Sequence, residues 1–496
     1  MDIRRLFVPV IEGKTRLQKL LELFTGSGGK VGIERVGTSY WLYSPIQDGR
    51  YQGTILTPFT TGAYTDIEIN GMSDRIPSLS IKDSNATYAT KTGTWTNNIA
   101  QALAYGGTYS FTATDGAYIT FTTPANVRRV GLRTVNITNA GIVLVSIDGD
   151  NTKANLLSTA QQLVDAGTIA DTCLVANGGT LNPTDRVINQ YFNGTNYDKR
   201  LVIADNLAAG VHTIVLTYTG YKQAASSAAR LYITGLMYND GTQTVATADI
   251  VMDTIQAVGG TASVYEPVQV IIPTGGTTGT YVGGIHGYST LNTTVITVDG
   301  VEVTPADGSI TPGDIISFAR NSSLYHPDID AGATEIGVSI TTYYPTARQG
   351  LRVTTQTTWS LGGTATTYYP GMFPVDNLMD KAANINLPLQ SGTLAADDGT
   401  KVVNAKSPAA YVYDSDGYYA ALLYTPDMEL NVKNYRENTT TLAHCWVEDT
   451  VGGARNKIYQ ARMANLVGVA YAINDVWSSD MQWRIFRLPN TLMLPL

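Results

Sequence analysis

The sequence predicts an all-β protein built from tandem, jelly-roll-like β-sandwich domains. Its 496 residues include 48 Gly and 19 Pro, and Tyr dominates the aromatic residues, with 30 Tyr against 9 Phe and 6 Trp. Only 15% of the residues are charged, compared with about 25% in an average soluble protein. The apolar content of 43% argues against disorder. Short strands joined by glycine-containing turns fit this composition best, and the length corresponds to about three domains.

Residues 1–80 are predicted to form an anchoring segment that contains one short helix. Between residues 14 and 24, four apolar side chains recur at helical spacing, and glycines follow at positions 26, 28 and 29. The four anchoring residues are Leu17, Leu20, Leu21 and Phe24. A helix of about ten residues is marginal alone, so this stripe must pack on the chain's own next domain or on a partner. Short strands are expected at Val31–Val36 and Ser39–Tyr43.

Residues 81–240 are predicted to form one β-sandwich. Residues 118–122 show the pattern, because Ile119 and Phe121 alternate with polar or amphipathic residues, which indicates one buried face. The strands expected are Thr108–Thr112, Ala117–Thr122, Arg129–Asn136, Ile142–Ile147, Leu201–Ala204, His212–Tyr218 and Leu231–Leu236. A helix is expected over residues 156–164, with Gly167 at its C-terminal cap.

Residues 241–496 are predicted to form a second β-sandwich domain. The strands expected are Val268–Ile272, Thr293–Val298, Ile315–Phe318, Glu335–Thr342, Leu351–Thr358, Tyr411–Tyr413, Tyr418–Tyr424, Cys445–Val447 and Gln482–Leu488. The turn Val298-Asp299-Gly300 repeats the pattern Ile147-Asp148-Gly149. Asp-Gly is a common turn dipeptide, so the repeat does not by itself indicate a duplication.

Charge, cysteine content and the lengths of apolar stretches limit the kinds of partner and the cellular location that we expect for this protein. The net charge is -8 and no dense basic run occurs, so binding to nucleic acid is not expected. Cys173 and Cys445 are far apart in the chain and are predicted to be separate buried thiols. The N-terminal apolar stretch is too short for a secretory signal, and no stretch is long enough to cross a membrane. Synthesis in a cytoplasm without membrane insertion is expected.

The sequence predicts no catalytic, metal or cofactor site. The four histidines, His212, His286, His326 and His444, lie outside the HExxH and CxxC patterns of zinc sites. His286 and His326 could converge with Asp328 or Asp330, but a hydrogen-bonded loop histidine is the preferred interpretation. Asp148 with Asp150 could likewise bind calcium, with a solvated turn preferred. No nucleophile elbow or phosphate-binding loop occurs, and a pair of hydrolytic carboxylates cannot be recognised from spacing. We therefore expect a protein that is not an enzyme.

Aromatic residues in turn-like contexts are the candidates for glycan binding. Their rings could stack on the apolar face of a sugar while neighbouring polar side chains bind its hydroxyl groups. The candidates are Tyr88, Trp95, Tyr105, Trp359, Tyr368 and Tyr369. The alternative is that each is a cross-strand core or interface residue.

Two short segments resemble known modules. The run Leu207–Leu216, with Gly210 and His212 before an apolar strand, resembles the closing segment of galactose-binding-like jelly rolls. The turn Ile147-Asp148-Gly149 resembles the strand-ending turn of those domains, which are similar to carbohydrate-binding domains and occur in bacteriophage appendage proteins. Residues 283–287, together with residues 324–327, look like a second domain found beside jelly rolls in phage tail fibres.

This resemblance implies a structural component of a phage particle, namely a tail fibre, spike or head fibre. The N-terminus would attach to other virion proteins, and the β-sandwich domains would project toward a host-surface glycan. The protein would be located in the virion as a homo-oligomer, with a trimer as the expected state. The alternatives are a polysaccharide depolymerase and a stand-alone carbohydrate-binding module.

Overall fold

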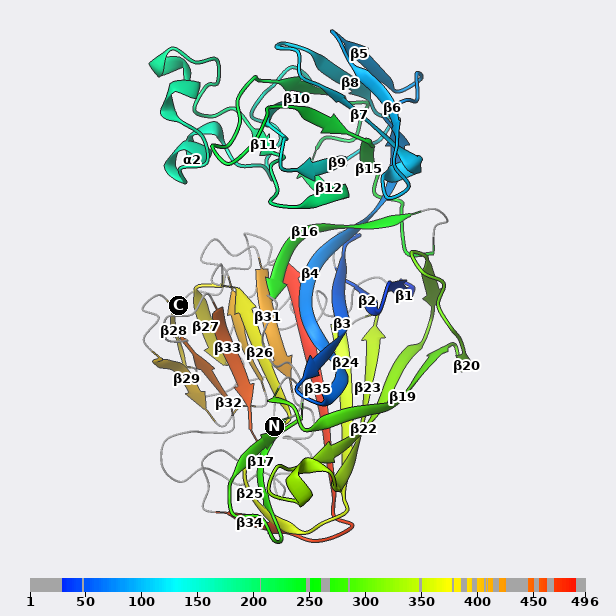
Figure 1. The fold of residues 1–496 in the computed structure, drawn as a ribbon, viewed down its shortest axis with the longest axis vertical. Coiled ribbons are helices and arrows are strands. Elements are labelled where there is room, and N and C mark those ends of the chain that lie inside the picture. The colour runs from blue at the N-terminus through cyan, green and yellow to red at the C-terminus, as the bar shows by residue number, and fades with distance from the viewer. Residues whose placement is uncertain are drawn as a thin grey trace, which may run out of the picture. The chain divides into compact units, whose positions relative to one another are not determined.

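The predicted all-β fold with tandem β-sandwiches is confirmed by a computed structural model of the chain (Figure 1), in which antiparallel sheets dominate. The structure describes residues 29–46, 49–205, 207–246, 250–259, 268–283, 286–347, 350–376, 379–384, 390–394, 399–405, 407, 409–413, 419–424, 445–449, 455–461 and 468–487. The expected N-terminal helix with Leu17, Leu20, Leu21 and Phe24 lies outside the described residues, as does His444.

The chain divides into two compact units. The larger unit comprises residues 1–74 and 256–496, and the smaller unit comprises residues 75–255. This division differs from the three domains expected from the sequence, because residues 31–74 belong to the larger unit. Leu42 and Leu56 share one hydrophobic core with Phe318 and Trp483. Contacts between such distant residues leave no signal in local periodicity, so the segment looked independent in the sequence.

The larger unit is a stack of antiparallel sheets. Its strands are β1 (Val31–Val36), β2 (Ser39–Pro45), β3 (Tyr51–Thr61), part of β4 (Tyr64–Lys82), β17 (Val268–Pro273), β18 (Thr280–Val282), β19 (Ser289–Val298), β20 (Val301–Glu302), β21 (Ile310–Gly313), β22 (Ile316–Tyr325), β23 (Glu335–Thr346), β24 (Gly350–Trp359), β25 (Gly363–Tyr369), β26 (Gly371–Asp376), β27 (Lys381–Asn384), β28 (Ser391–Thr393), β29 (Lys401–Ala405), β30 (Ala409–Tyr413), β31 (Tyr419–Tyr424), β32 (Cys445–Glu448), β33 (Arg455–Gln460), β34 (Val469–Tyr471) and β35 (Val476–Arg487). A 3₁₀ turn spans Asp330–Gly332. β16 (Val251–Gly259) pairs with β4.

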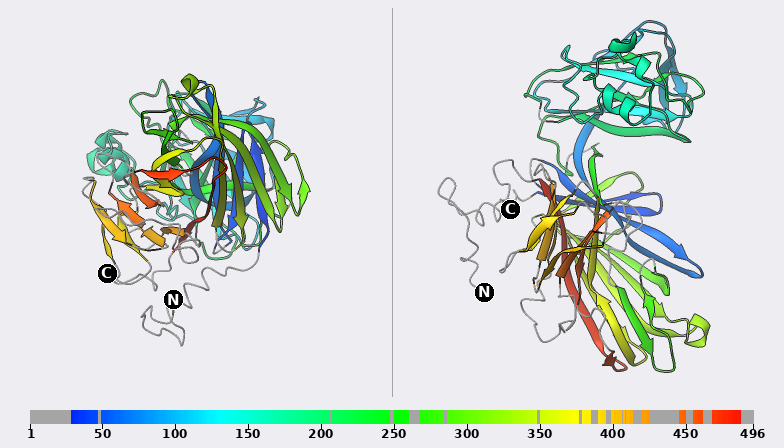
Figure 2. Two further views of the ribbon diagram at one scale, coloured as in Figure 1. Left: turned by 90° about the horizontal axis from the view of Figure 1, so that it is seen from below. Right: turned by 90° about the vertical axis from the view of Figure 1, so that its left-hand side faces the viewer.

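One long sheet organises the larger unit. Its strand order is β20-β19-β22-β23-β24-β35-β31-β30-β27-β28, and Figure 2 shows its green, yellow and red strands side by side. Phe318, Val353 and Trp483 from this sheet share a core with Phe373 and Ile458. The last two belong to a second sheet of order β26-β33-β32-β29. The packing of one apolar sheet face on another is the arrangement of a β-sandwich.

The smaller unit is a second β-sandwich. Its elements are the end of β4, β5 (Ala89–Thr92), β6 (Thr96–Ala100), β7 (Thr108–Thr112), β8 (Tyr118–Thr122), β9 (Arg129–Ile137), β10 (Ile142–Ile147), α2 (Ala160–Asp165), β11 (Val187–Asn189), β12 (Thr195–Ala204), β13 (Thr213–Tyr218), β14 (Leu231–Ile233), β15 (Gly235–Asn239) and 3₁₀ turns at Tyr105–Gly107, Asp171–Cys173 and Val175–Asn177. Its sheets have the orders β12-β9-β15-β4, β11-β10-β13-β8-β5 and β14-β7-β6. Phe121, Leu132 and Leu216 lie in the core that they enclose.

Helix α2 begins later than expected, at Ala160 rather than Leu156. Thr159 caps it, because its side chain accepts a hydrogen bond from the Gln162 amide while the Gln162 side chain binds the Thr159 amide. This capping box fixes the first helical turn. Leu157 packs instead in the sandwich core. Gly167 follows the helix with φ of +65°, as expected for a C-terminal cap.

The two cysteines are buried and unpaired, Cys173 in the smaller unit and Cys445 in the larger. Burial raises the pKa of both thiols. We therefore expect neither thiol of the native protein to react with Ellman's reagent at pH 8, whereas both react in denaturant. The melting temperature should be the same with and without reductant. Rapid labelling of one thiol in the folded protein would contradict this burial.

Candidate functional site

Three of the six predicted glycan-binding residues lie in the smaller unit, and each is partly buried by its neighbours. Tyr88 and Trp95 pack against the sandwich core, and Trp95 Nε1 donates a hydrogen bond to the Thr92 carbonyl at 3.1 Å. The Tyr105 ring is covered by the Arg133 guanidinium, 4.0 Å from the ring centroid. Each of these three residues is therefore held by contacts within the unit and keeps part of its ring exposed.

The other three candidates lie in the larger unit, and two of them are core residues. Trp359 and Tyr368 are 0% and 1% exposed and pack on Trp477 with centroid distances of 5.0 and 5.2 Å. The expectation that they are exposed is therefore wrong. Alternate residues of β24 face inward from Leu351 to Trp359, so Trp359 continues a buried row rather than starting a turn. Burial also raises the pKa of Tyr369.

A different aromatic group, which the sequence interpretation missed, is formed by side chains of β7, β12 and β14 in the smaller unit. We call it the Tyr109 cluster and define it as Tyr109, Phe111, Tyr197 and Tyr232. Ring centroids are 5.9 Å apart for Tyr109 and Tyr232, 6.0 Å for Tyr109 and Tyr197, and 5.4 Å for Phe111 and Tyr232. Tyr232 is buried, whereas the other three rings are partly exposed.

The orientation of β7 is the reverse of that in an ordinary half-buried strand. Its inward residues are polar, since Ser110 and Thr112 are 0% and 1% exposed. Ser110 donates a hydrogen bond to Asp83 at 2.6 Å. Tyr109 and Phe111 alternate with them and therefore lie on the opposite face of the strand, where they pack against Val135, Ala140 and Tyr232. Both rings stay partly exposed, so part of their surface is open to a ligand.

Polar groups border the Tyr109 cluster. The Tyr232 hydroxyl donates a hydrogen bond to Asn139 Oδ1 at 2.7 Å and accepts one from Arg230 Nη1 at 3.4 Å. The Arg230 guanidinium lies 4.8 Å from the centroid of Phe111. The arrangement places rigid aromatic faces beside hydrogen-bond donors. The alternation of Tyr109 and Phe111 with polar residues was visible in the sequence, but it does not tell which face is inward.

The two segments that resemble galactose-binding-like jelly rolls meet in the smaller unit. His212 Nδ1 lies 2.9 Å from Asp148 Oδ2, and His212 Nε2 lies 3.1 and 2.9 Å from the carbonyl oxygens of Val127 and Ala208. Because carbonyl oxygens only accept hydrogen bonds, Nε2 carries a proton. Burial raises the pKa of Asp148, but hydrogen bonds from His212, the Thr213 amide and Lys153 outweigh it and lower that pKa overall.

Asp148 and Asp150 serve the turn in which they lie. Asp148 and Gly149 both have positive φ, +54° and +80°, as a tight type I′ turn requires. Asp150 Oδ1 accepts hydrogen bonds from the amide and hydroxyl of Thr152 at 2.8 and 2.7 Å. Across the part of the chain that the structure describes, no group of three His, Cys, Asp or Glu side chains is placed to hold a metal ion.

His286 and His326 have separate environments. His326 is buried, its Nε2 donates to the Ile271 carbonyl at 3.1 Å, and its Nδ1 accepts from the Asp328 amide at 3.2 Å. These bonds define the neutral ring, and burial lowers the pKa of His326. The ring of His286 stacks on Tyr281 at 4.7 Å and is exposed to solvent. His326 is a hydrogen-bonded loop histidine, as preferred from the sequence.

These shifts predict that the two units respond differently to acid. A histidine whose pKa is lowered by folding contributes stability that is complete above about pH 6.5 and is lost as the pH falls below it. Asp148 and Asp240, whose pKa values are lowered, contribute stability that is lost only below about pH 4. Between pH 7.5 and 5.0, we expect the larger unit, which contains His326, to lose stability first.

Tryptophan fluorescence measures this difference. Trp95 is the only one of the six tryptophans within residues 75–255, so in the Trp95→Phe variant the fluorescence reports on the larger unit. Its melting temperature should fall between pH 7.5 and 5.0, and His326→Asn should reduce that dependence. A melting temperature that is constant over this range would contradict the role of the buried His326.

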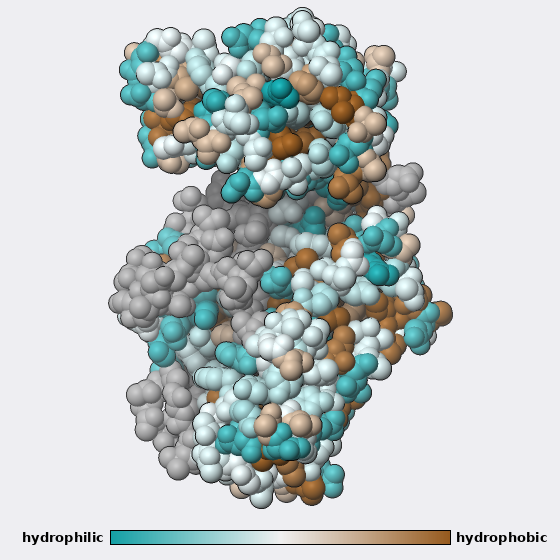
Figure 3. Space-filling model, viewed as in Figure 1, coloured by the Kyte–Doolittle hydropathy of each residue, from teal (hydrophilic) through white to brown (hydrophobic). Residues whose placement is uncertain are grey.

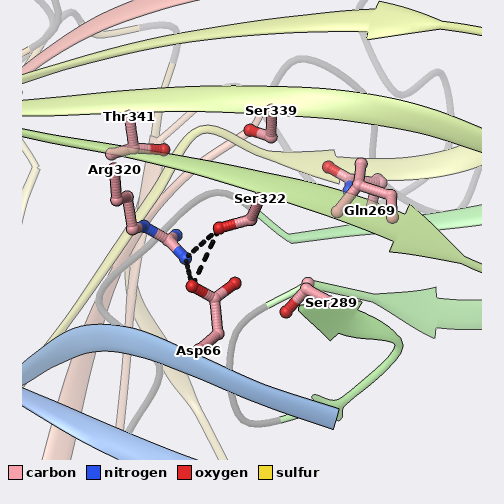
Figure 4. Close-up of a pocket in the computed structure, with 9 residues that line it drawn as sticks. Asp66, Gln269, Ser289, Arg320, Ser322, Ser339 and Thr341 are labelled. Atoms are coloured by element: carbon pink, nitrogen blue, oxygen red, sulfur yellow. Dashed lines mark hydrogen bonds and ion pairs between the residues drawn. The ribbon is translucent and has the colours of Figure 1, made fainter. Parts of the chain in front are cut away.

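A small polar cavity lies in the larger unit between β4, β17, β19 and β22 (Figure 4). Asp66 Oδ1 accepts hydrogen bonds from Arg320 Nη1 at 2.7 Å and Ser322 Oγ at 2.8 Å. Among the described residues, Asp66 Oδ2 and Ser289 Oγ are buried there without a partner. The free space of about 10 Å³ is close to the minimum for one water molecule. The cavity is therefore suited to a bridging water rather than a substrate.

Comparisons with known proteins do not assign the chain to a family. No family model matches the sequence, and no curated protein matches it. A xanthan lyase from Paenibacillus is 11% identical with a TM-score of 0.22, and the match covers 91% of this chain and 37% of the lyase. The translocation pore of the P pilus usher PapC is 9% identical with a TM-score of 0.08, covering 92% of this chain and 97% of the usher. These TM-scores are too low to support an argument from either structure.

No helix in the described ranges combines the length and the apolar character that a membrane span requires.

Proposed function

We propose that this protein is a non-catalytic structural component of a bacteriophage particle, such as a tail fibre, spike or head fibre, whose smaller unit contacts a host-surface glycan. The observation that carries the proposal is the Tyr109 cluster. Ser110 and Thr112 are buried on one face of β7, while Tyr109 and Phe111 on the other face stay partly exposed beside Tyr197. A strand that buries hydroxyl groups and leaves rings partly exposed is suited to contact a ligand at this edge of the unit.

Sugar binding fits the chemistry of the Tyr109 cluster. Tyr and Phe rings are rigid and present apolar faces at a low entropy cost, and the C–H face of a sugar ring is also apolar. Arg230 and Asn139 add polar groups beside the rings, and such groups fix the orientation of a ligand. The face seen in Figure 3 mixes polar and apolar residues.

Membership of a virion is supported by the resemblance of Leu207–Leu216 and Ile147–Gly149 to parts of jelly rolls found in phage appendages. The contact of His212 with Asp148 joins these two segments. Attachment through the N-terminal segment, assembly as a trimer and a location in the virion are parts of the same proposal. Low charge and abundant glycine are compatible with a protein on the outside of a particle.

Glycan binding is tested by a glycan array followed by calorimetry on the hits. Replacing Tyr109 by alanine should weaken binding by about tenfold or more, because a lost aromatic contact costs roughly 1–3 kcal/mol. Tyr281→Ala, an exposed tyrosine of the larger unit, is the matched control and should bind as the wild type does. Absence of glycan binding, or equal binding by Tyr109→Ala, would overturn the proposal. New reducing ends during incubation with host capsule would establish a depolymerase instead.

Attachment is tested by deleting residues 1–28, which leaves every described residue in place. Because the core of the larger unit begins at Val31, the melting temperature should be nearly unchanged. Incorporation into particles, measured by mass spectrometry of purified virions, should be lost. A shortened protein that still joins particles would contradict attachment through this segment, and one that melts much earlier would place the segment in the chain's own core.

A further inference from the structure

Arg230 is held in a fixed position on the Tyr109 cluster. Its guanidinium lies over the face of Phe111 at 4.8 Å and donates from Nη1 to the Tyr232 hydroxyl at 3.4 Å. Phe111 and Tyr232 are directly paired residues of β7 and β14, so both contacts come from rigid strands. An arginine stacked on an aromatic ring is oriented before a ligand arrives, which reduces the entropy lost on binding.

The charge of Arg230 lacks a counterpart within the described part of the chain. Its guanidinium contacts the Phe111 ring and the Tyr232 hydroxyl. By contrast, Arg133 and Arg200 of the same unit both bind the Asp198 carboxylate, at distances down to 2.5 Å for Arg133 and at 3.4 Å for Arg200. Arg230 is also partly exposed, so a ligand can reach it. A positive group beside exposed rings favours a ligand that is negative and has an apolar face.

The hydrogen-bonding groups around Arg230 are mainly donors. A guanidinium has five N–H groups, and one of those of Arg230 binds Tyr232. Asn139 Oδ1 already accepts from the Tyr232 hydroxyl, so the Asn139 amide group has N–H donors to offer. Several free N–H donors favour a ligand group that only accepts hydrogen bonds, such as a carboxylate. The planar guanidinium of an arginine can bind a carboxylate through two parallel hydrogen bonds.

We propose that the Tyr109 cluster binds an acidic glycan, with Arg230 pairing with the carboxylate of a uronic acid unit while Tyr109 and Phe111 contact the sugar ring. This inference rests on the proposed function and adds the chemical class of the glycan. A uronic acid carries its carboxylate at the edge of a ring whose face is apolar. One uronic acid unit therefore supplies both a negative charge for Arg230 and an apolar face for the aromatic rings. A neutral sugar would leave Arg230 without a counter-charge.

Three polymers test whether binding depends on the carboxylate of the sugar or only on the shape of its ring. Polygalacturonate carries a carboxylate on every unit, highly methyl-esterified polygalacturonate keeps the ring but loses the charge, and dextran sulfate offers charge without a carboxylate. We expect polygalacturonate to bind at least about tenfold more tightly than its methyl ester, the effect of one charge-assisted hydrogen-bonded pair. Raising the salt concentration from 50 to 500 mM should weaken the binding, because exposed charges are screened.

Substitutions of Arg230 test whether this residue causes the preference for polygalacturonate over its methyl ester. Arg230→Met keeps the length of the side chain and should bring the affinity for polygalacturonate down to that for the methyl ester. Arg230→Lys keeps the charge but loses the planar fork and should bind with intermediate affinity. Arg128→Met is the matched control, because Arg128 is an exposed arginine of the same unit outside the cluster. Its affinity should equal that of the wild type.

Different outcomes distinguish this inference from the proposed function. If Tyr109→Ala abolishes binding but Arg230→Met does not, the cluster binds glycans and the acidic specificity is wrong. Equal affinity for polygalacturonate and its methyl ester would also overturn the inference, as would tighter binding of dextran sulfate. If neither these polymers nor any glycan on the array binds, the proposed function fails as well.

Discussion

Replacing Trp359 by alanine is expected to destabilise the larger unit by about 3–5 kcal/mol, the usual cost of removing a buried aromatic side chain. Trp359 is fully buried and packs between Tyr471, at a centroid distance of 4.9 Å, and Trp477, at 5.0 Å. Alanine would leave a cavity that these rings cannot fill without moving from their own contacts. The measurement is the urea midpoint of the larger unit, followed by circular dichroism.

Two variants sharpen this test. Trp359→Phe keeps an aromatic ring and removes the buried indole N–H, which has no hydrogen-bond partner among the described residues, so it should cost much less than alanine. Trp95→Ala removes a partly buried tryptophan of the smaller unit and should leave the midpoint of the larger unit unchanged. A loss below about 1 kcal/mol for Trp359→Ala, well under the range for buried aromatic residues, would contradict the packing around Trp359.

The same residue shows what strand patterns can and cannot predict. Alternation along residues 351–359 is visible in the sequence, and β24 (Gly350–Trp359) is close to the predicted strand. Alternation assigns residues to two faces but does not say which face is buried. That choice depends on what packs against the sheet. Trp359 is therefore a candidate exposed ring by sequence although it lies inside, and the partly exposed rings of β7 were overlooked.

Connections between distant strands could not be predicted for a different reason. β1 pairs with β21, so Val31 lies opposite Gly313, and no local pattern links these positions. The turn at Asp148 and the strand that begins after His212 were both visible in the sequence, but their contact depends on the sandwich that brings β10 and β13 together. Local chemistry predicted the elements, whereas tertiary packing decided the site.

Breaking the buried pair of Asp66 and Arg320 is the second substitution expected to have a large effect. Arg320→Met should destabilise the larger unit by about 3–5 kcal/mol, because it leaves a carboxylate buried without its counter-charge. Asp66 and Arg320 have side-chain exposures of 0% and 6%, and their atoms Oδ1 and Nη1 lie 2.7 Å apart. Arg320 Nε also donates to the Tyr343 hydroxyl at 3.1 Å, and this bond is lost too.

A double variant and a surface pair separate the buried charge from the loss of packing. Removing both charges in Asp66→Asn with Arg320→Met should restore more than half of the lost stability, since the main cost is the unpaired charge rather than the missing attraction. Arg352→Met breaks an ion pair with Asp480 whose arginine side chain is 45% exposed, and it should cost less than about 1 kcal/mol. If the double variant is less stable than Arg320→Met alone, the two residues act through separate contacts, and the pair does not stabilise the unit as a charge-compensated whole.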